Sequence, residues 1–229
     1  MTSLAIGMQT AWRPKEVISD SLTSLRSAGF NQPVHVFGEP NAYMPRTEGV
    51  IPHVNREILG CFPNWKNSVL WLLEYTTADW ILMLQDDVIW RNDGGLQLAA
   101  GMRDFPAVGL LSPYTSPKMV PHEMRLETPA DDRWQEAQFY DKAFIGALAL
   151  CFPRRSLELL VSHERFLGHT HHRKTDVLVG NTLRLELGLS ILVHVPSLAD
   201  HTGSWSTIGR HRIRGIQWGR KGLGYRETA

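Results

Sequence analysis

Apolar residues fall in short runs along the chain, and amphipathic segments separate these runs. Leu4 to Met8 and residues 33–37 are apolar runs of strand length. Between them, residues 15–28 place apolar side chains on one helical face and stop before Gly29, a residue that suits a helix end. A strand, a helix and a second strand in this order predict the unit of a parallel sheet.

The strongest pattern lies near the middle of the sequence. Five apolar residues run from Trp80 to Leu84, and Asp86 and Asp87 follow after one glutamine. An unbroken apolar run predicts a strand buried on both faces, and the two acids then lie at its carboxyl end, where open α/β sheets bind ligands. Adjacent carboxylates repel each other, and a hard divalent cation such as Mg²⁺ or Mn²⁺ keeps them ionised. A solvated turn is the other interpretation.

The rest of the pattern continues the alternation. Helices are predicted at about 64–75, 94–103, 153–162 and 176–187, and strands at 108–111, 139–143, 146–152 and 190–195. The segments 40–62 and 112–137 are rich in proline and are predicted to be irregular. We therefore expect an α/β fold class, with a single Rossmann-like domain over residues 1–209, a mostly parallel central sheet flanked by helices, and a basic tail over residues 210–229.

Composition and charge limit the class of protein. The 229 residues include two cysteines, Cys61 and Cys151, which are far apart and predict no disulfide framework. The sequence shows no signal peptide and no apolar run of membrane-spanning length, so we expect a cytoplasmic protein. The net charge is +1, yet residues 210–229 hold six basic residues against one acid. Such a tail suits an anionic partner, either nucleic acid or a membrane surface on which the protein would be peripheral, and a solvated tail is an equal alternative.

The order of these features resembles the GT-A-fold glycosyltransferases that use nucleotide sugars. Gln85-Asp86-Asp87 is similar to the Asp-x-Asp motif of that family, and the strand-to-helix segment from Gly146 to Pro153 follows it. Pro196 to Leu198 then leads to the His-x-Gly-x-x-Ser-Thr segment that starts at His201. The resemblance covers about residues 3–209. It implies a GT-A-like domain and the metal-dependent transfer of a hexosyl or pentosyl group from a nucleotide diphosphate sugar, by family habit a UDP sugar, to an acceptor hydroxyl.

The resemblance also implies site residues by position. Asp87 and His201 would bind Mn²⁺ or Mg²⁺, and Asp86 would contact the ribose or the sugar of the donor, or the metal through water. The other implied donor-binding residues are Thr10, Ala11, Arg13, Glu39, Asn64 and Lys66. Helix capping is the alternative role of Asn64, and a phosphate contact or a surface position is the alternative for Arg13.

An inverting reaction would need a general base to deprotonate the acceptor. The resemblance implies Asp176, which is predicted at the start of a late helix, with Asp141 as the second candidate. Asp176 also suits a helix N-terminus without any catalytic role. The histidines His169, His171 and His172 suggest a zinc site, a loop near an anionic acceptor or diphosphate, or a solvated loop. The stereochemistry of transfer stays open.

Three functions remain after this comparison. The resemblance implies a glycosyltransferase whose acceptor is a surface polysaccharide, a lipid-linked glycan or a hydroxymethylated DNA base. A nucleotidyltransferase is the second candidate, although residues 9–13 contain no glycine for the phosphate loop that such enzymes carry after the first strand. A nucleotide-sugar-binding module with a degenerate site is the third.

Overall fold

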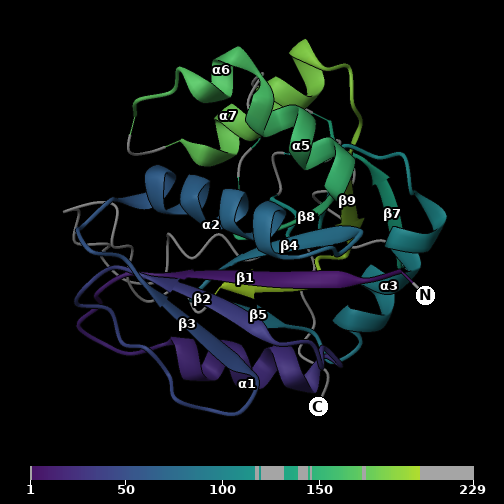
Figure 1. The fold of residues 1–229 in the computed structure, drawn as a ribbon. Coiled ribbons are helices and arrows are strands. Elements are labelled where there is room, and N and C mark those ends of the chain that lie inside the picture. The colour runs from purple at the N-terminus through teal and green to yellow at the C-terminus, as the bar shows by residue number, and fades with distance from the viewer. Residues whose placement is uncertain are drawn as a thin grey trace, which may run out of the picture.

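The computed structural model describes residues 2–116, 119, 132–138, 144, 146–171 and 174–201. Within these residues, an eight-stranded sheet has the strand order β3-β2-β1-β4-β8-β6-β9-β7, and helices cover both of its faces (Figure 1). Four of its pairings are parallel. The other three are antiparallel. The structure confirms the predicted α/β class and the mostly parallel central sheet.

The elements follow one another in a largely alternating order. The first half of the chain contains β1 (Leu4–Thr10), α1 (Ile18–Ser27), β2 (Val34–Gly38), β3 (Val50–Val54), α2 (Cys61–Tyr75), β4 (Trp80–Gln85), β5 (Val88–Trp90) and α3 (Gly94–Asp104). The second half contains β6 (Leu110–Ser112), β7 (Arg133–Glu136), β8 (Ala149–Pro153), α5 (Arg154–Ser162), α6 (Glu164–Leu167), α7 (Thr175–Asn181), the π-helix η2 (Thr182–Glu186), β9 (Ile191–Val195) and β10 (Ala199–His201).

Strand β4 shows why its sequence is apolar without interruption. Its odd-numbered residues Ile81 and Met83 pack in the core that includes α2, α5 and α7. Leu82 and Leu84 point to the opposite face and pack in the core that includes α1 and α3. Figure 1 shows α2, α5, α6 and α7 over one face of the sheet and α1 under the other. A strand with two covered faces leaves only its end for polar chemistry.

Several predicted boundaries shift for local reasons. Helix α1 begins at Ile18 and not at residue 15, and Glu16 Oε1 accepts a hydrogen bond from the Ser19 backbone N at 2.7 Å. Helix α2 begins at Cys61, so the prediction that Asn64 caps it is wrong. The helix predicted at 176–187 ends as the π-helical turn η2.

The prediction of an irregular 40–62 segment missed strand β3. This strand lies at one end of the sheet and contains Pro52. An edge strand tolerates proline because one of its sides needs no hydrogen-bond donor. The strand predicted at 139–143 and the basic tail from residue 210, with the boundary before it, lie outside the described residues.

The part of the chain that the structure describes contains no helix with the length and hydropathy that crossing a membrane requires.

Candidate functional site

Three neighbouring strands bring the polar loops of the site together. Strand β1 pairs in parallel with β2 on one side and with β4 on the other. Thr10 lies opposite Gly38, and Gln9 lies opposite Gln85, so the three carboxyl ends meet at one edge of the sheet. This edge is where doubly wound sheets form their ligand crevice.

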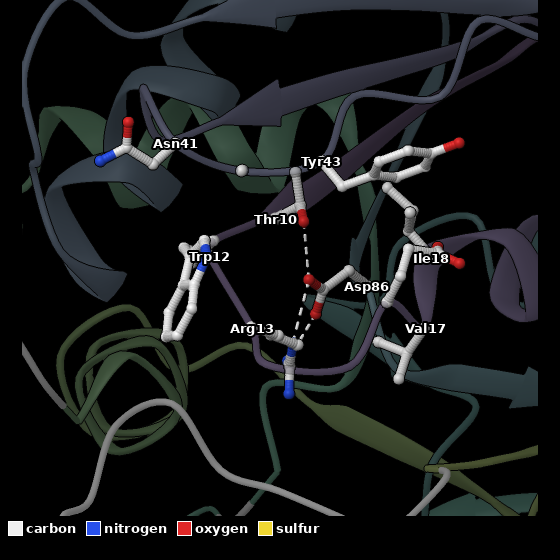
Figure 2. A pocket seen from close by; sticks show the side chains of 11 residues that line it. Thr10, Trp12, Arg13, Val17, Ile18, Asn41, Tyr43 and Asp86 are labelled. Carbon is white, nitrogen blue, oxygen red and sulfur yellow. Dashed lines mark hydrogen bonds and ion pairs between the residues drawn. The ribbon is translucent and has the colours of Figure 1, made fainter.

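A cavity of about 280 Å³ opens at this edge. Its walls come from the loop after β1, the loop after β2 and the turn after β4 (Figure 2). The lining residues are Thr10, Ala11, Trp12, Arg13, Glu16, Val17, Ile18, Asn41, Ala42, Tyr43 and Asp86. Four of the predicted site residues therefore line one cavity: Thr10, Ala11, Arg13 and Asp86.

Asp86 is held in the wall of this site by two side chains, one from the end of β1 and one from the loop after it. Thr10 Oγ1 donates to Asp86 Oδ2 at 2.7 Å. Arg13 binds the same carboxylate with two groups, Nε to Oδ2 at 3.1 Å and Nη2 to Oδ1 at 2.5 Å. The Asp86 side chain is 4% exposed, so this two-point contact is a buried ion pair with fixed geometry.

The same guanidinium reaches the second acid. Arg13 Nη2 lies 3.3 Å from Asp87 Oδ2, and the two side chains are 11% and 13% exposed. Burial alone would lower the pKa of Arg13, but the hydrogen bond and the charge of Asp86, with those of Asp87, outweigh burial and raise it. Arg13 is therefore a permanent cation, and it offsets the repulsion between the adjacent carboxylates.

Two exposed aromatic rings flank the mouth of the cavity. Trp12 is 61% exposed and Tyr43 is 55% exposed, and Asn41 lies with them at the rim (Figure 2). The sequence analysis missed Trp12, Asn41 and Tyr43. A signal was present, because Asn41 and Tyr43 directly follow the second strand, whose carboxyl end had to lie beside that of the first.

Glu39 does not line this cavity. It is 6% exposed, and its carboxylate accepts the backbone N–H groups of Leu59 at 2.9 Å and Gly60 at 3.0 Å. Gly60 is the residue before α2, so Glu39 holds the segment that enters this helix. A contact of Glu39 with a donor base stays a prediction, and the contacts observed are structural.

The other predicted donor residues belong to α2 and point elsewhere. Asn64 is buried, donates to the carbonyl of Phe37 at 3.2 Å and accepts from Asn55 at 3.0 Å. Lys66 places its ammonium 5.5 Å from the ring centroid of Phe166. Both contacts tie α2 to its neighbours, and neither residue lines the cavity.

Asp176 lies in the first turn of α7, as predicted. Its carboxylate accepts the backbone N–H of Gly146 at 3.0 Å and that of Val177 at 2.9 Å. It lies outside the cavity lining, and its role as a base stays a prediction. Asp141 lies outside the described residues.

A small second sheet places the backbone of His201 next to the turn that holds Asp86 and Asp87. Strand β10 pairs antiparallel with β5, and the His201 backbone lies opposite Val88, the residue after Asp87. The structure does not describe the His201 side chain. Among the described residues, no group of three or more histidine, cysteine or acidic side chains is placed to hold a metal ion.

The histidine cluster is partly described. The His169 and His171 rings are 5.6 Å apart between centroids, and His169 packs edge-on against Phe62 at 4.6 Å. His172 lies outside the described residues, so the zinc site stays a prediction.

Comparison with known proteins gives a fold and no family. No protein-family model and no curated protein matches the sequence. Among solved structures 452 chains match, so the fold is widespread and does not by itself select an activity. One of them is CMP:2-keto-3-deoxy-manno-octonic acid synthetase complexed with CTP, with 15% identity and a TM-score of 0.53, and the match covers 84% of this chain and 89% of that chain.

This likeness corrects the enzyme assignment. The sequence-based expectation of a glycosyltransferase is wrong on this comparison, because a solved structure that shares the fold is a synthetase of a CMP-linked product complexed with CTP. The physical reason is that acids at the carboxyl end of a central strand suit any nucleotide site and do not select glycosyl transfer. The comparison shows a mixed α/β, Rossmann-like fold for this chain.

Proposed function

We propose that this chain is a nucleotidyltransferase, which binds a nucleoside triphosphate at the cavity between the loops that follow β1 and β2. The observation that carries the proposal is the cavity itself, at the carboxyl ends of β2, β1 and β4, with a permanent cation and a buried acid in its wall. The shared fold with a synthetase complexed with CTP supports the same class of ligand.

The cavity suits the nucleoside part of such a ligand. Its volume of about 280 Å³ is near the lower end of small-molecule sites, which begin at about 300 Å³. Trp12 and Tyr43 offer exposed ring faces for base stacking, which typically contributes about 1–3 kcal/mol per base. The Asn41 amide carries both donors and an acceptor for the base edge. Thr10 is buried and Arg13 is mostly buried at the same cavity, where they would face the phosphates of a bound nucleotide.

The proposed reaction makes one bond and breaks one. A hydroxyl oxygen of a sugar or sugar acid attacks the α-phosphorus of the nucleoside triphosphate, and its proton leaves to a base or to water. The bond from the α-phosphorus to the bridging oxygen breaks, and pyrophosphate leaves with the electron pair. Arg13 pairs with Asp86 and Asp87 and offsets most of the repulsion that these carboxylates would exert on the phosphates.

A nucleotide-binding module without catalysis is the second candidate. The observation that favours it is the neutralisation of the acid pair by Arg13, because carboxylates engaged in an ion pair are poor bases and poor metal ligands. Both candidates predict nucleotide binding, and only the first predicts turnover.

Two measurements test the proposal. Thermal unfolding with CTP, UTP, ATP and GTP should show an increased melting temperature with one of them, and Asn41→Ala should reduce the shift. Asn67→Ala, on the exposed face of α2, is the matched control and should leave the shift unchanged. Pyrophosphate release over a panel of sugars and sugar acids then separates the two candidates. No shift with any nucleotide would refute both.

A further inference from the structure

The acid pair does not fit a divalent cation as its side chains lie. Both oxygens of Asp86 accept hydrogen bonds, from Thr10 and from the two groups of Arg13. Asp87 Oδ2 lies 3.3 Å from Nη2 of the same guanidinium. A metal ion shared between the Asp86 carboxylate and Asp87 Oδ2 would lie at the place that Arg13 occupies.

We propose that Arg13 replaces the divalent cation at this acid pair, so that the nucleotide site is completed by a side chain and not by a metal. The guanidinium supplies one positive charge for two carboxylates, and its planar geometry matches the two oxygens of Asp86. Because its pKa is far above neutral pH, this cation does not dissociate and needs no supply from solution.

Burial makes the replacement exclusive. The Arg13 and Asp86 side chains are 11% and 4% exposed, and a second cation in this space would meet the guanidinium at short range with little water to screen the repulsion. The metal and Arg13 therefore compete for the same carboxylates. A divalent ion binds only when the guanidinium leaves.

Thr10 adds to this preference for the arginine. Its hydroxyl donates to Asp86 Oδ2, the same oxygen that accepts from Arg13 Nε. This hydrogen bond fixes the carboxylate plane against the guanidinium, so the two-point contact costs little side-chain entropy. Thr10 ends β1 and Arg13 follows three residues later. The same short segment therefore supplies both groups that favour the guanidinium over a metal ion.

The test uses Mn²⁺ alone, on the full chain, without any nucleotide. Free aqueous Mn²⁺ gives a strong electron paramagnetic resonance signal that is lost when the ion binds a protein. Wild type should leave the signal unchanged at millimolar Mn²⁺. Arg13→Ala and Arg13→Gln should each bind Mn²⁺ at least about tenfold more tightly, because one contact-range positive charge is removed. Arg13→Lys keeps the charge and should behave as wild type.

The double variant Arg13→Gln/Asp87→Asn is the control for location and should lose the gained Mn²⁺ binding. Mn²⁺ binding to wild type as tight as to Arg13→Gln would overturn the proposal, and so would a folded Arg13→Gln protein that binds no Mn²⁺. If Arg13→Ala and Arg13→Gln both fail to fold, the test is the affinity of the wild-type protein for a nucleotide, measured once with Mn²⁺ and once with EDTA. Equal affinity in Mn²⁺ and in EDTA supports the replacement, and binding that requires Mn²⁺ refutes it.

The proposal that Arg13 takes the place of a metal ion rests on the proposed function in one respect, which is that a nucleotide binds at this edge of the sheet. The Mn²⁺ titration contains no nucleotide, so its failure is distinct from a failure of nucleotide binding. Conversely, an absent nucleotide shift together with the expected Mn²⁺ pattern would refute the proposed function and leave the ion-pair assignment intact.

Discussion

Glu39 gives the sharpest prediction about how the fold supports the site. Its buried carboxylate accepts two backbone N–H groups, from Leu59 and Gly60, at the entry to α2. The same residue was predicted from the sequence to contact the donor. The structural contacts predict that replacing Glu39 destabilises the protein, whereas a ligand contact alone predicts a loss of binding with unchanged stability.

The magnitude follows from the two contacts. In Glu39→Gln the amide oxygen still accepts one N–H, but the amide nitrogen is a donor and cannot accept the other. Losing one charge-assisted hydrogen bond lowers the free energy of unfolding by about 1.5–3 kcal/mol. Removing the charge from the N-terminal end of α2 costs a further ~0.5 kcal/mol. Glu39→Ala leaves both N–H groups unpaired and should cost about 3–5 kcal/mol.

Urea unfolding followed by circular dichroism measures these losses. Glu57→Gln is the matched control, because Glu57 is exposed on the segment that leads into α2. This substitution should change the free energy of unfolding by less than about 0.5 kcal/mol. A Glu39→Gln protein as stable as wild type would refute the reasoning. If that protein also lost its nucleotide-induced shift, the ligand role of Glu39 would replace the structural one.

Three further predictions concern the frame around the site. Arg154 donates to three backbone carbonyls between the end of α2 and the start of β4, so Arg154→Ala should lower the free energy of unfolding by about 3 kcal/mol in urea titrations. A Cβ on Gly95 would lie 2.4 Å from the Ala28 carbonyl oxygen, and Gly95→Ala should cost about 1–3 kcal/mol by the same assay. Burial lowers the pKa of His194 below its ordinary value of 6.5, so the unfolded chain takes up a proton that the folded chain does not. Stability should therefore decrease as the pH falls below that value, with a smaller decrease in His194→Gln, and equal slopes would contradict this assignment.

The sequence predicted the parts of the fold that depend on periodicity. Strand β4 was predictable because both of its faces are covered, which leaves an unbroken apolar run before the acids. Strand β3 was missed because an edge strand carries Pro52 and exposed side chains, so it shows neither a continuous nor an alternating pattern. Within the described residues the short strands β5 and β10 pair only with each other, and this pairing has no local signal.

The candidate site was predictable in position and not in contacts. The end of a central strand indicated Asp86, and the resemblance implied Thr10 and Arg13. The ion pair between Arg13 and Asp86 joins residues 73 positions apart, and no spacing rule reveals it. The resemblance implied Glu39 as a contact of the donor, but here the entry to α2 uses its carboxylate.

The cavity at the ends of β2, β1 and β4 should bind a nucleotide, and isothermal titration of the purified chain with CTP, UTP, ATP and GTP measures this binding. We predict saturable binding of at least one of them in the presence of EDTA, weakened in Asn41→Ala and unchanged in Asn67→Ala. Absence of heat with all four, with and without Mg²⁺, would contradict it.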